Sequence, residues 1–378
     1  MFLTFDGSRE RIVAGLMSGT SVDAIDVGVV RITPNGINID VSVIAYAEFP
    51  WTLEERTAII TVSTANVSAQ DIAMVDRMVG DRFSSSLEQV TKAADVQVDA
   101  IGFHGQTVAH VPSPARGFSS STLQLGNPYA CAQKFKCPVV FDFRRADMLT
   151  GGQGAPLVPA ADSLMFHREL QNGAIAIQNI GGIGNVTYLT PDNPPIGFDT
   201  GPGNMVMDQV MHARTGSHFD QDGGMAASGT VNQDVFRALK RWHVPSLPPV
   251  SYGREDFGQP FVDRLLAGSE NVVTADLMAT VSEWTATTIS DAMHSLPSMP
   301  QCIYVCGGGA HNRDLIARVE RILGIPALPL VSLGINGDAR EATAFAVLAD
   351  ARLRGVTFDL RYVTGSQVRQ GLGAIALP

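Results

Sequence analysis

The chain has 378 residues, of which 45% are apolar and 17% charged, and its net charge is −10. This composition is typical of a globular protein with room for two domains, and the acidic balance argues against nucleic acid as a main partner, because phosphate binding needs a basic face. Apolar runs are all shorter than the roughly 18 residues that a membrane span needs. The first ten residues lack a signal-peptide pattern and the four cysteines lack zinc-ligand spacing, so we expect free thiols in a cytoplasmic protein.

The first half of the chain predicts the order β-β-β-α-β-α-β-α. Ser68 and Asp71 have the spacing of a capping box, and apolar residues recur at helical intervals after them. The expected strands lie near Ile12–Leu16, Ile25–Ile32, Ile39–Ala47, Ala100–Phe103 and Val139–Phe143, and the expected helices near 68–90, 130–136 and after Pro159.

The second half predicts the same order, with negligible sequence identity to the first. Its Pro- and Gly-rich residues 245–258 predict a mobile surface segment. The expected strands lie near Ala174–Ile180, Val186–Leu189, Ile196–Phe198, Cys302–Cys306 and Leu328–Val331, and the expected helices begin near Asn204 or cover Asp276–Leu296, Asp314–Leu323 and Glu341–Leu353.

This doubled order predicts an α/β fold. Three hairpin-linked strands followed by alternating helices and strands favour a mixed sheet with helices on its faces. We therefore predict two domains, residues 1–165 and 166–378, with a ligand cleft between them. The last residues are candidates for packing back on the first domain.

The segment Gly15–Asp26, GLMSGTSVDAID, joins two predicted strands through a turn of small and hydroxyl residues. Small residues let backbone N–H groups approach an anion, and Thr20 and Ser21 add hydroxyl donors. Asp23 and Asp26 offer hard oxygen ligands to a divalent cation. The pattern favours a loop that holds a nucleoside triphosphate with its metal, and a polar hairpin turn is the alternative.

Further glycine-rich segments follow predicted strands: HGQT at 104–107, GGQGAP at 151–156, NIGGIGN at 179–185 with DTGPGN at 199–204, and GGGAHN at 307–312. Glycine removes the side chain where ligand and backbone meet, so the set predicts a ligand site rather than ordinary turns. GGGAHN fits a turn that passes close to a nucleotide base or ribose.

Charged residues end two of these predicted strands. Asp199 is a candidate general base, and capping of its own turn is the alternative. Arg144 and Arg145, with Asp142 and Asp147, either bind a phosphate or an anionic group of a substrate, or form an internal Arg–Asp network.

The strings GLMSGTSVDAID, GFHGQT, QLGNP, DFRRADMLTGGQGAPLVP, NIGGIGNVT, GFDTGPGN and VCGGGAHN occur in this order. From about Ile12 to Ala349 the chain resembles the anhydro-N-acetylmuramic acid kinases. The resemblance implies two ribonuclease-H-like domains, as in the actin-like and hexokinase-like ATPases, around an ATP cleft. It implies that water opens 1,6-anhydro-N-acetylmuramic acid and ATP phosphorylates the 6-hydroxyl, giving N-acetylmuramic acid 6-phosphate and ADP in peptidoglycan recycling and amino-sugar metabolism.

The same resemblance assigns roles to residues. Asp199 would activate the water, magnesium would be held through Asp23 and Asp26, and the protein would be a homodimer. The implied sugar contacts are His104, Gln106, Thr107 and Glu341. The implied ATP contacts are Gly19, Thr20, Ser21, Asp23, Asp26, Gly181, Gly182, Gly201, Gly203, Asn204, Gly307, Gly308 and Gly309.

Two departures from the family pattern stand in these motifs. Ala24 replaces a usual Gly, and Tyr252 replaces a usual Thr, so residue 252 is given no role. Two other functions fit the same residues. A simple sugar kinase would use Asp199 to deprotonate an open hydroxyl, and a non-catalytic actin-like protein would only bind ATP.

Overall fold

The computed structural model describes residues 6–243 and 252–378, and contacts within it divide the chain into two compact units. The first unit comprises the residues up to His167 together with Leu333–Pro378, and the second is Arg168–Ser332. The described helices are all too short or too polar to cross a membrane.

The sheet of the first unit has the strand order β12-β6-β4-β1-β2-β3, with β5 paired to β4. β1, β4 and β6 run parallel, whereas β2 is antiparallel to both β1 and β3. The strands are β1 (Arg11–Ser18), β2 (Ala24–Asn35), β3 (Asn38–Pro50), β4 (Ala100–Val111), β5 (Ser121–Leu125), β6 (Val139–Phe141) and β12 (Ala374–Ala376). The core order β3-β2-β1-β4-β6 is that of a ribonuclease-H-like sheet.

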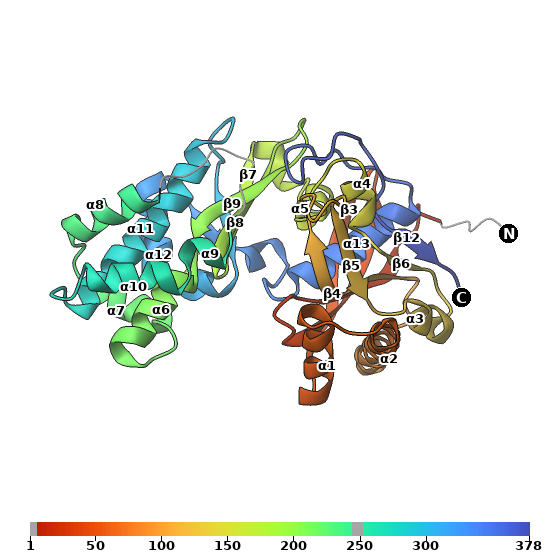
Figure 1. The fold of residues 1–378 in the computed structure, drawn as a ribbon. Coiled ribbons are helices and arrows are strands. Elements are labelled where there is room, and N and C mark those ends of the chain that lie inside the picture. Colours follow the sequence, from red (N-terminus) through yellow and green to blue (C-terminus); the bar gives the residue numbers. More distant parts are fainter. Residues whose placement is uncertain (1–5, 244–251) are drawn as a thin grey trace. The chain divides into compact units, whose positions relative to one another are not determined.

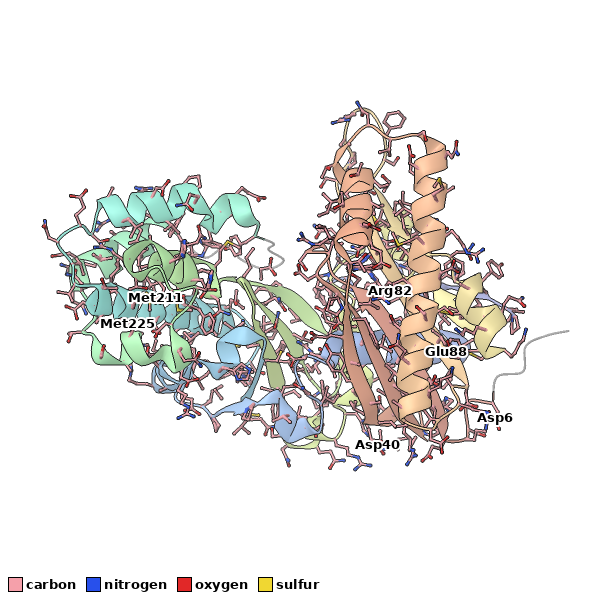
Figure 2. All side chains as sticks on the ribbon, turned by 90° about the horizontal axis from the view of Figure 1, so that it is seen from below. Asp6, Asp40, Arg82, Glu88, Met211 and Met225 are labelled. Carbon is pink, nitrogen blue, oxygen red and sulfur yellow. The ribbon has the colours of Figure 1, made fainter. Side chains whose placement is uncertain are left out.

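Helices cover this sheet because its strands are apolar on both faces. Phe83 and Leu87 of α2 pack into a core with Phe103 of β4, and α2 lies along the unit in Figure 2, where Arg82 and Glu88 are labelled on it. The helices of this unit are α1 (Leu53–Thr64), α2 (Ala69–Ala93), α3 (Tyr129–Phe135), α4 (Arg145–Leu149), α5 (Val158–Met165) and α13 (Arg340–Leu353).

Helix α13 packs closely on β1, β2 and β4, and in Figure 1 this blue helix lies among red and orange elements. Ala342 and Ala346 face the sheet where it carries Gly15, and a Cβ on Gly15 would collide with the Ala342 carbonyl. We predicted residues 166–378 as the second domain, but Leu333–Pro378 belong to the first unit, where these small residues let α13 pack on the sheet. The boundary between the two units therefore differs from the predicted domain boundary, because local sequence patterns do not reveal which elements pack together.

The second unit repeats the strand order as β9-β8-β7-β10-β11, with β7, β10 and β11 parallel. The prediction of two ribonuclease-H-like domains is thus confirmed by the two sheets. The strands are β7 (Ile175–Ile180), β8 (Ile183–Leu189), β9 (Ile196–Pro202), β10 (Ile303–Cys306) and β11 (Ala327–Pro329).

A helical layer covers the second sheet around the buried Trp284 of α11, and Met211 and Met225, labelled in Figure 2, belong to the same apolar cluster. Its helices are α6 (Asn204–Thr215), α7 (Gly224–Ser228), α8 (Gln233–Trp242), α9 (Arg254–Phe257), α10 (Gln259–Ala267), α11 (Thr274–His294) and α12 (Arg313–Leu323). Short 3₁₀ turns cover Glu169–Asn172, Gln221–Gly223, Gly308–His311 and Leu330–Leu333.

Several elements were not predicted, including α1, α4, β5 and α7 to α10. The apolar residues of α1 have almost no helical periodicity, so the pattern could not reveal it. Of the segment predicted as mobile, residues 245–251 lie outside the described residues, and the buried Phe257 anchors its later part.

Candidate functional site

The turn between β1 and β2 has a fixed backbone and open hydroxyl groups. Val22 is buried beneath it with a positive φ of 54°, and its N–H donates to the Gly19 carbonyl at 3.1 Å. Arg56 Nε donates to the Val22 carbonyl at 2.9 Å. Thr20 and Ser21 are exposed. The turn therefore presents donors to solvent from a rigid support, as an anion-binding loop requires.

Gln106 lies beneath the same turn and is fully buried. Its Nε2 donates to the Gly19 carbonyl at 3.0 Å and to the Thr107 carbonyl at 3.2 Å. Thr107 Oγ1 in turn accepts from Gln124 Nε2 at 3.2 Å. Gln106 therefore supports the β1–β2 turn, a position that differs from the direct sugar contact implied by the resemblance.

The two aspartates after this turn have different surroundings. Asp23 is exposed, 3.7 Å from Arg56 Nη2. Asp26 is partly buried and accepts from Tyr46 Oη at 2.6 Å, and Tyr46 Oη also lies 2.8 Å from Glu48 Oε1. Burial raises the pKa of Asp26 to about 6, with Glu48 and Glu341 adding repulsion. Across the described ranges, no group of three or more Asp, Glu, His or Cys side chains is arranged to hold a metal.

His104 follows β-strand residue Phe103 at an irregularity in the ladder, where Leu16 pairs with Phe103 but Met17 pairs with Gly105. Such a bulge redirects a side chain. The buried imidazole accepts from Arg144 Nε at 3.0 Å through Nε2, and its Nδ1 lies 2.9 Å from the Gly105 carbonyl. Because a carbonyl only accepts and Nε–H only donates, the ring is the neutral Nδ1–H tautomer. Burial and the nearby Arg144 lower the pKa of His104 well below its usual range.

The GGQGAP segment holds Arg144 from its other side. Arg144 Nη1 donates to the Gly154 carbonyl at 2.7 Å, and the Gly154 N–H donates to buried Asp147 Oδ2 at 2.8 Å. Thr364 Oγ1 donates to the other Asp147 oxygen at 2.7 Å. Burial lowers the pKa of Arg144 to about 10, so the guanidinium stays charged at neutral pH. The glycine-rich loop is thus built around this arginine.

A cavity of about 230 Å³ opens in the first unit beside His104. Asp142 and Arg145, which form an ion pair at 3.3 Å, line it together with Asn127 and Gln124. Glu341 is exposed in the first turn of α13, and its charge acts on both Asp26 and Arg144. The predicted sugar contacts His104 and Glu341 therefore belong to one charged neighbourhood of this unit.

In the second unit, Asp199 lies on β9 just before a ladder irregularity at Thr200. Its Oδ2 accepts the backbone N–H of Tyr252 at 2.8 Å. This bond uses the backbone of residue 252, so the replacement of a usual Thr by Tyr leaves it in place. Gln178 Nε2 donates to Thr200 Oγ1 at 2.9 Å and fixes the strand next to the carboxylate. Asp199 is thereby oriented while staying partly exposed.

The predicted nucleotide residues of this unit meet at the ends of β7, β9 and β10. The N–H groups of Gly203 and Asn204 donate to the carbonyls of Gly182 and Gly181 at 3.0 and 2.7 Å. A Cβ on Gly203 would collide with the Gly181 carbonyl, so the two turns can touch only with glycine there. Asn204 Nδ2 also donates to the Ile180 carbonyl at 3.2 Å, and Gly308 lies beside it.

A cavity of about 400 Å³ opens beside these turns, lined by Asn204, Met207, Asp208, Phe219, Asp220, Gln221, Asp222, Gly308, His311 and Asn312. Burial raises the pKa of Asp208 to about 6. Asp220, in contrast, accepts the N–H groups of Met225 and Ala226 at 2.8 and 2.9 Å and so caps α7. The cavity thus combines apolar side chains with the carboxylates of Asp208 and Asp222, neither of which caps α7.

Sequence reasoning missed Asp208, Tyr46 and Glu48. The spacing of four residues from Asn204 to Asp208 was a usable signal, because it places both on one face of a helix. Tyr46 and Glu48 alternate on β3 opposite β2, and only the strand register brings them to Asp26.

Comparison with known proteins decides the family. The model of the family described as anhydro-N-acetylmuramic acid kinase matches residues 11–378. The chain belongs to the anhydro-N-acetylmuramic acid kinase family. Relatives of that name include the protein of Salinibacter ruber, which is 38% identical over 97% of this chain and 96% of its own length. The protein of Picosynechococcus is 37% identical over 97% of this chain and 99% of its own length. The relative in Vibrio cholerae is 35% identical over 98% of this chain and 100% of its own.

Membership of this family makes the chain a kinase, and both units share in the match because it extends over residues 11–378. The sequence prediction of the family is therefore confirmed. The family match extends over the β1–β2 turn, the His104–Arg144 pair and Asp199 alike.

Proposed function

We propose that this chain converts 1,6-anhydro-N-acetylmuramic acid, water and ATP into N-acetylmuramic acid 6-phosphate and ADP, within peptidoglycan recycling and amino-sugar metabolism. The match to the kinase family over residues 11–378 is the observation that carries this proposal. The placement of Asp199, oriented by a backbone N–H and partly exposed, supports it.

Asp199 acts in this proposal as the general base. It takes a proton from water, and the water oxygen bonds to the anomeric carbon as the bond from that carbon to the bridge oxygen breaks. The bridge oxygen, now the 6-oxygen, bonds to the γ-phosphorus of ATP, and ADP leaves. The proton remains on Asp199 until solvent removes it. Positioning and neutralisation of charge supply most of the catalysis of phosphoryl transfer.

ATP is assigned to the glycine turns. In the first unit, Thr20 and Ser21 in the β1–β2 turn would contact phosphates. In the second unit, the lack of side chains at Gly201 and Gly203 would let the nucleotide approach closely, and the cavity of about 400 Å³ would take the nucleoside. The apolar side chains of Met207 and Phe219 suit a base, and the Asp208 carboxylate suits a ribose hydroxyl.

Magnesium fits the carboxylates after the β1–β2 turn. Mg²⁺ is usually bound through one or two carboxylates plus phosphate oxygens and water, so a cage of protein ligands is not needed. Asp23 and Asp26 would hold it, Asp23 being the exposed one. When bound, the ion would neutralise charge on the phosphates.

The test uses water labelled with ¹⁸O. The wild type should yield a product that has gained one phosphoryl group and one labelled oxygen at the anomeric carbon. Asp199→Asn should lose about 100-fold or more of the rate, whereas Asp192→Asn, an exposed carboxylate in the β8–β9 loop, should stay within twofold. A product with phosphate but no label would indicate a simple sugar kinase. Absence of sugar-stimulated ATP turnover would indicate a non-catalytic ATP-binding protein.

We also propose a cytoplasmic homodimer. The support is the membership of the anhydro-N-acetylmuramic acid kinase family. Sedimentation at several concentrations tests the dimer, and fractionation of the producing cells tests the compartment. A monomer throughout, or recovery outside the cytoplasm, would contradict these two statements without affecting the reaction.

A further inference from the structure

Arg144 is partly buried, and it differs in its partners from two buried arginines of its unit. Arg11 and Arg340, only 2% and 6% exposed, form ion pairs with Asp350 and Asp162. Arg144 donates instead to two neutral acceptors, His104 Nε2 and the Gly154 carbonyl. Within residues 6–243 and 252–378 it forms no ion pair, and Glu341 and Asp147 act on it only through longer-range attraction.

A partly buried cation without a paired anion loses part of its hydration, and neutral acceptors replace that hydration without neutralising the charge. Two parts of the structure hold this guanidinium in place. His104 is redirected by a ladder irregularity to accept from Nε, and the GGQGAP loop is held by Asp147 so that Gly154 accepts from Nη1. Such fixation is typical of a guanidinium prepared for a ligand, since it leaves the other terminal nitrogen to donate.

The position of Arg144 in the sheet indicates which anion it meets. β1, β4 and β6 are parallel and adjacent in the order β6-β4-β1, so their carboxyl ends lie at one edge. Arg144 follows β6, whereas the β1–β2 turn proposed for phosphate follows β1. Two strand spacings separate these ends by about 10 Å. Arg144 therefore suits an anionic substituent on the sugar better than the phosphates.

We propose that Arg144 binds the carboxylate of the lactyl group that distinguishes muramic acid from glucosamine, and that His104 is a positioning residue for this guanidinium. The inference rests on the proposed reaction, whose sugar carries this carboxylate. In this inference Arg144 selects the substrate, and His104 takes no part in proton transfer. The imidazole is neutral and both its nitrogens are hydrogen-bonded, so it orients Arg144 and contributes no charge.

The experiment measures the preference for 1,6-anhydro-N-acetylmuramic acid over 1,6-anhydro-N-acetylglucosamine, which has the same ring system without the lactyl group. Dissociation constants are obtained by calorimetry for the full chain. Arg144→Gln should lower the preference by about 30-fold or more, because a charge-assisted pair is lost, and should change binding of the glucosamine sugar by less than threefold. Arg77→Gln, an exposed arginine on α2, should leave the preference unchanged.

Further variants separate positioning from folding. Arg144→Lys keeps the charge without the planar fork and should retain part of the preference. His104→Ala should lower the preference in the same direction, and His104→Gln, which retains an acceptor, should recover part of it. ATP affinity and circular dichroism report whether each variant is folded.

Equal losses for both sugars would overturn the inference, as would an unchanged preference in Arg144→Gln. A loss confined to ATP affinity would place the guanidinium on a phosphate instead and would also overturn it. The ¹⁸O experiment on the wild type decides the proposed reaction separately, so failure of one is distinguishable from failure of the other.

Discussion

The hydroxyl of Tyr46 lies 2.6 Å from Oδ1 of Asp26. The same hydroxyl lies 2.8 Å from Oε1 of Glu48, yet it carries one hydrogen. One of the two contacts is therefore a hydrogen bond only when a carboxyl supplies the proton. The raised pKa of Asp26, about 6, agrees with a proton held in this group. Register across β2 and β3 thus creates a titrating carboxyl next to the proposed phosphate turn.

The free energy of unfolding should decrease as the pH rises, because the Asp26 carboxyl loses its proton. The folded state holds the Asp26 proton up to about pH 6, whereas the unfolded chain releases it near pH 4. Its stabilising contribution is fully present below about pH 4 and is lost as pH rises through about 6. Asp26→Asn should therefore gain melting temperature relative to the wild type between pH 4 and 7. Thermal denaturation across this pH range measures the difference.

The Tyr46 hydroxyl should hold the pKa of Asp26 down. Its hydrogen bond stabilises the carboxylate and opposes burial, so Tyr46→Phe should raise the pKa further above 6. Glu48→Gln should lower it, because a neighbouring negative charge disappears. Carbon-13 NMR titration of the carboxyl groups measures both shifts. Asp208, which titrates in the same range in the other unit, is an internal control, and a parallel shift there would show a global rather than a local effect.

Gln106 should affect phosphate transfer through the turn that it supports. Gln106→Ala removes the donor to the Gly19 carbonyl, so we expect kcat to fall about 10- to 100-fold, in the range that misplacement of reacting groups produces. The KM for the sugar should change by less than threefold. Steady-state kinetics with both substrates checks this, with Gln133→Ala, an exposed residue of α3, as the control. A change confined to sugar KM would return Gln106 to the role of direct sugar contact.

Asp208 should affect nucleotide affinity and little else. Its carboxylate lines the cavity of about 400 Å³ and has no capping role. Asp208→Ala should raise the KM for ATP about tenfold or more while kcat stays within threefold, because one charge-assisted hydrogen bond is lost. The loss should be smaller for 2′- or 3′-deoxy-ATP if the partner is the hydroxyl removed. Equal losses for all three nucleotides would exclude ribose as the partner.

Gly15 should be intolerant of any side chain. A Cβ there would meet the Ala342 carbonyl and the Ala346 nitrogen of α13, which belong to backbone and cannot rotate away. Gly15→Ala should destabilise the chain by about 3 kcal/mol or more, at the upper end of overpacking costs. Gly224→Ala, at a helical glycine with open space around it, should be neutral or slightly stabilising. Chemical denaturation compares the two variants.

Much of the fold was predictable because it depends on local patterns. The opening hairpins of both halves appear as apolar runs, and α2 and α12 are amphipathic with recognisable caps. Helices such as α1 were not predictable, since their apolar residues do not follow one face. Which unit α13 joins was also not predictable, because Gly15 and Ala342 are far apart in sequence and each is unremarkable by itself.

The sequence by itself determined the family, the doubled strand order and the chemical groups available, because motif strings and periodicity are local properties of the chain. The tertiary structure alone decided how those groups are used. It joined His104 to Arg144 by a hydrogen bond, placed Gln106 beneath the β1–β2 turn, and brought Tyr46 and Glu48 to Asp26. These outcomes depend on strand register and on long-range hydrogen bonds, which fix the partner of each donor only after the chain has folded.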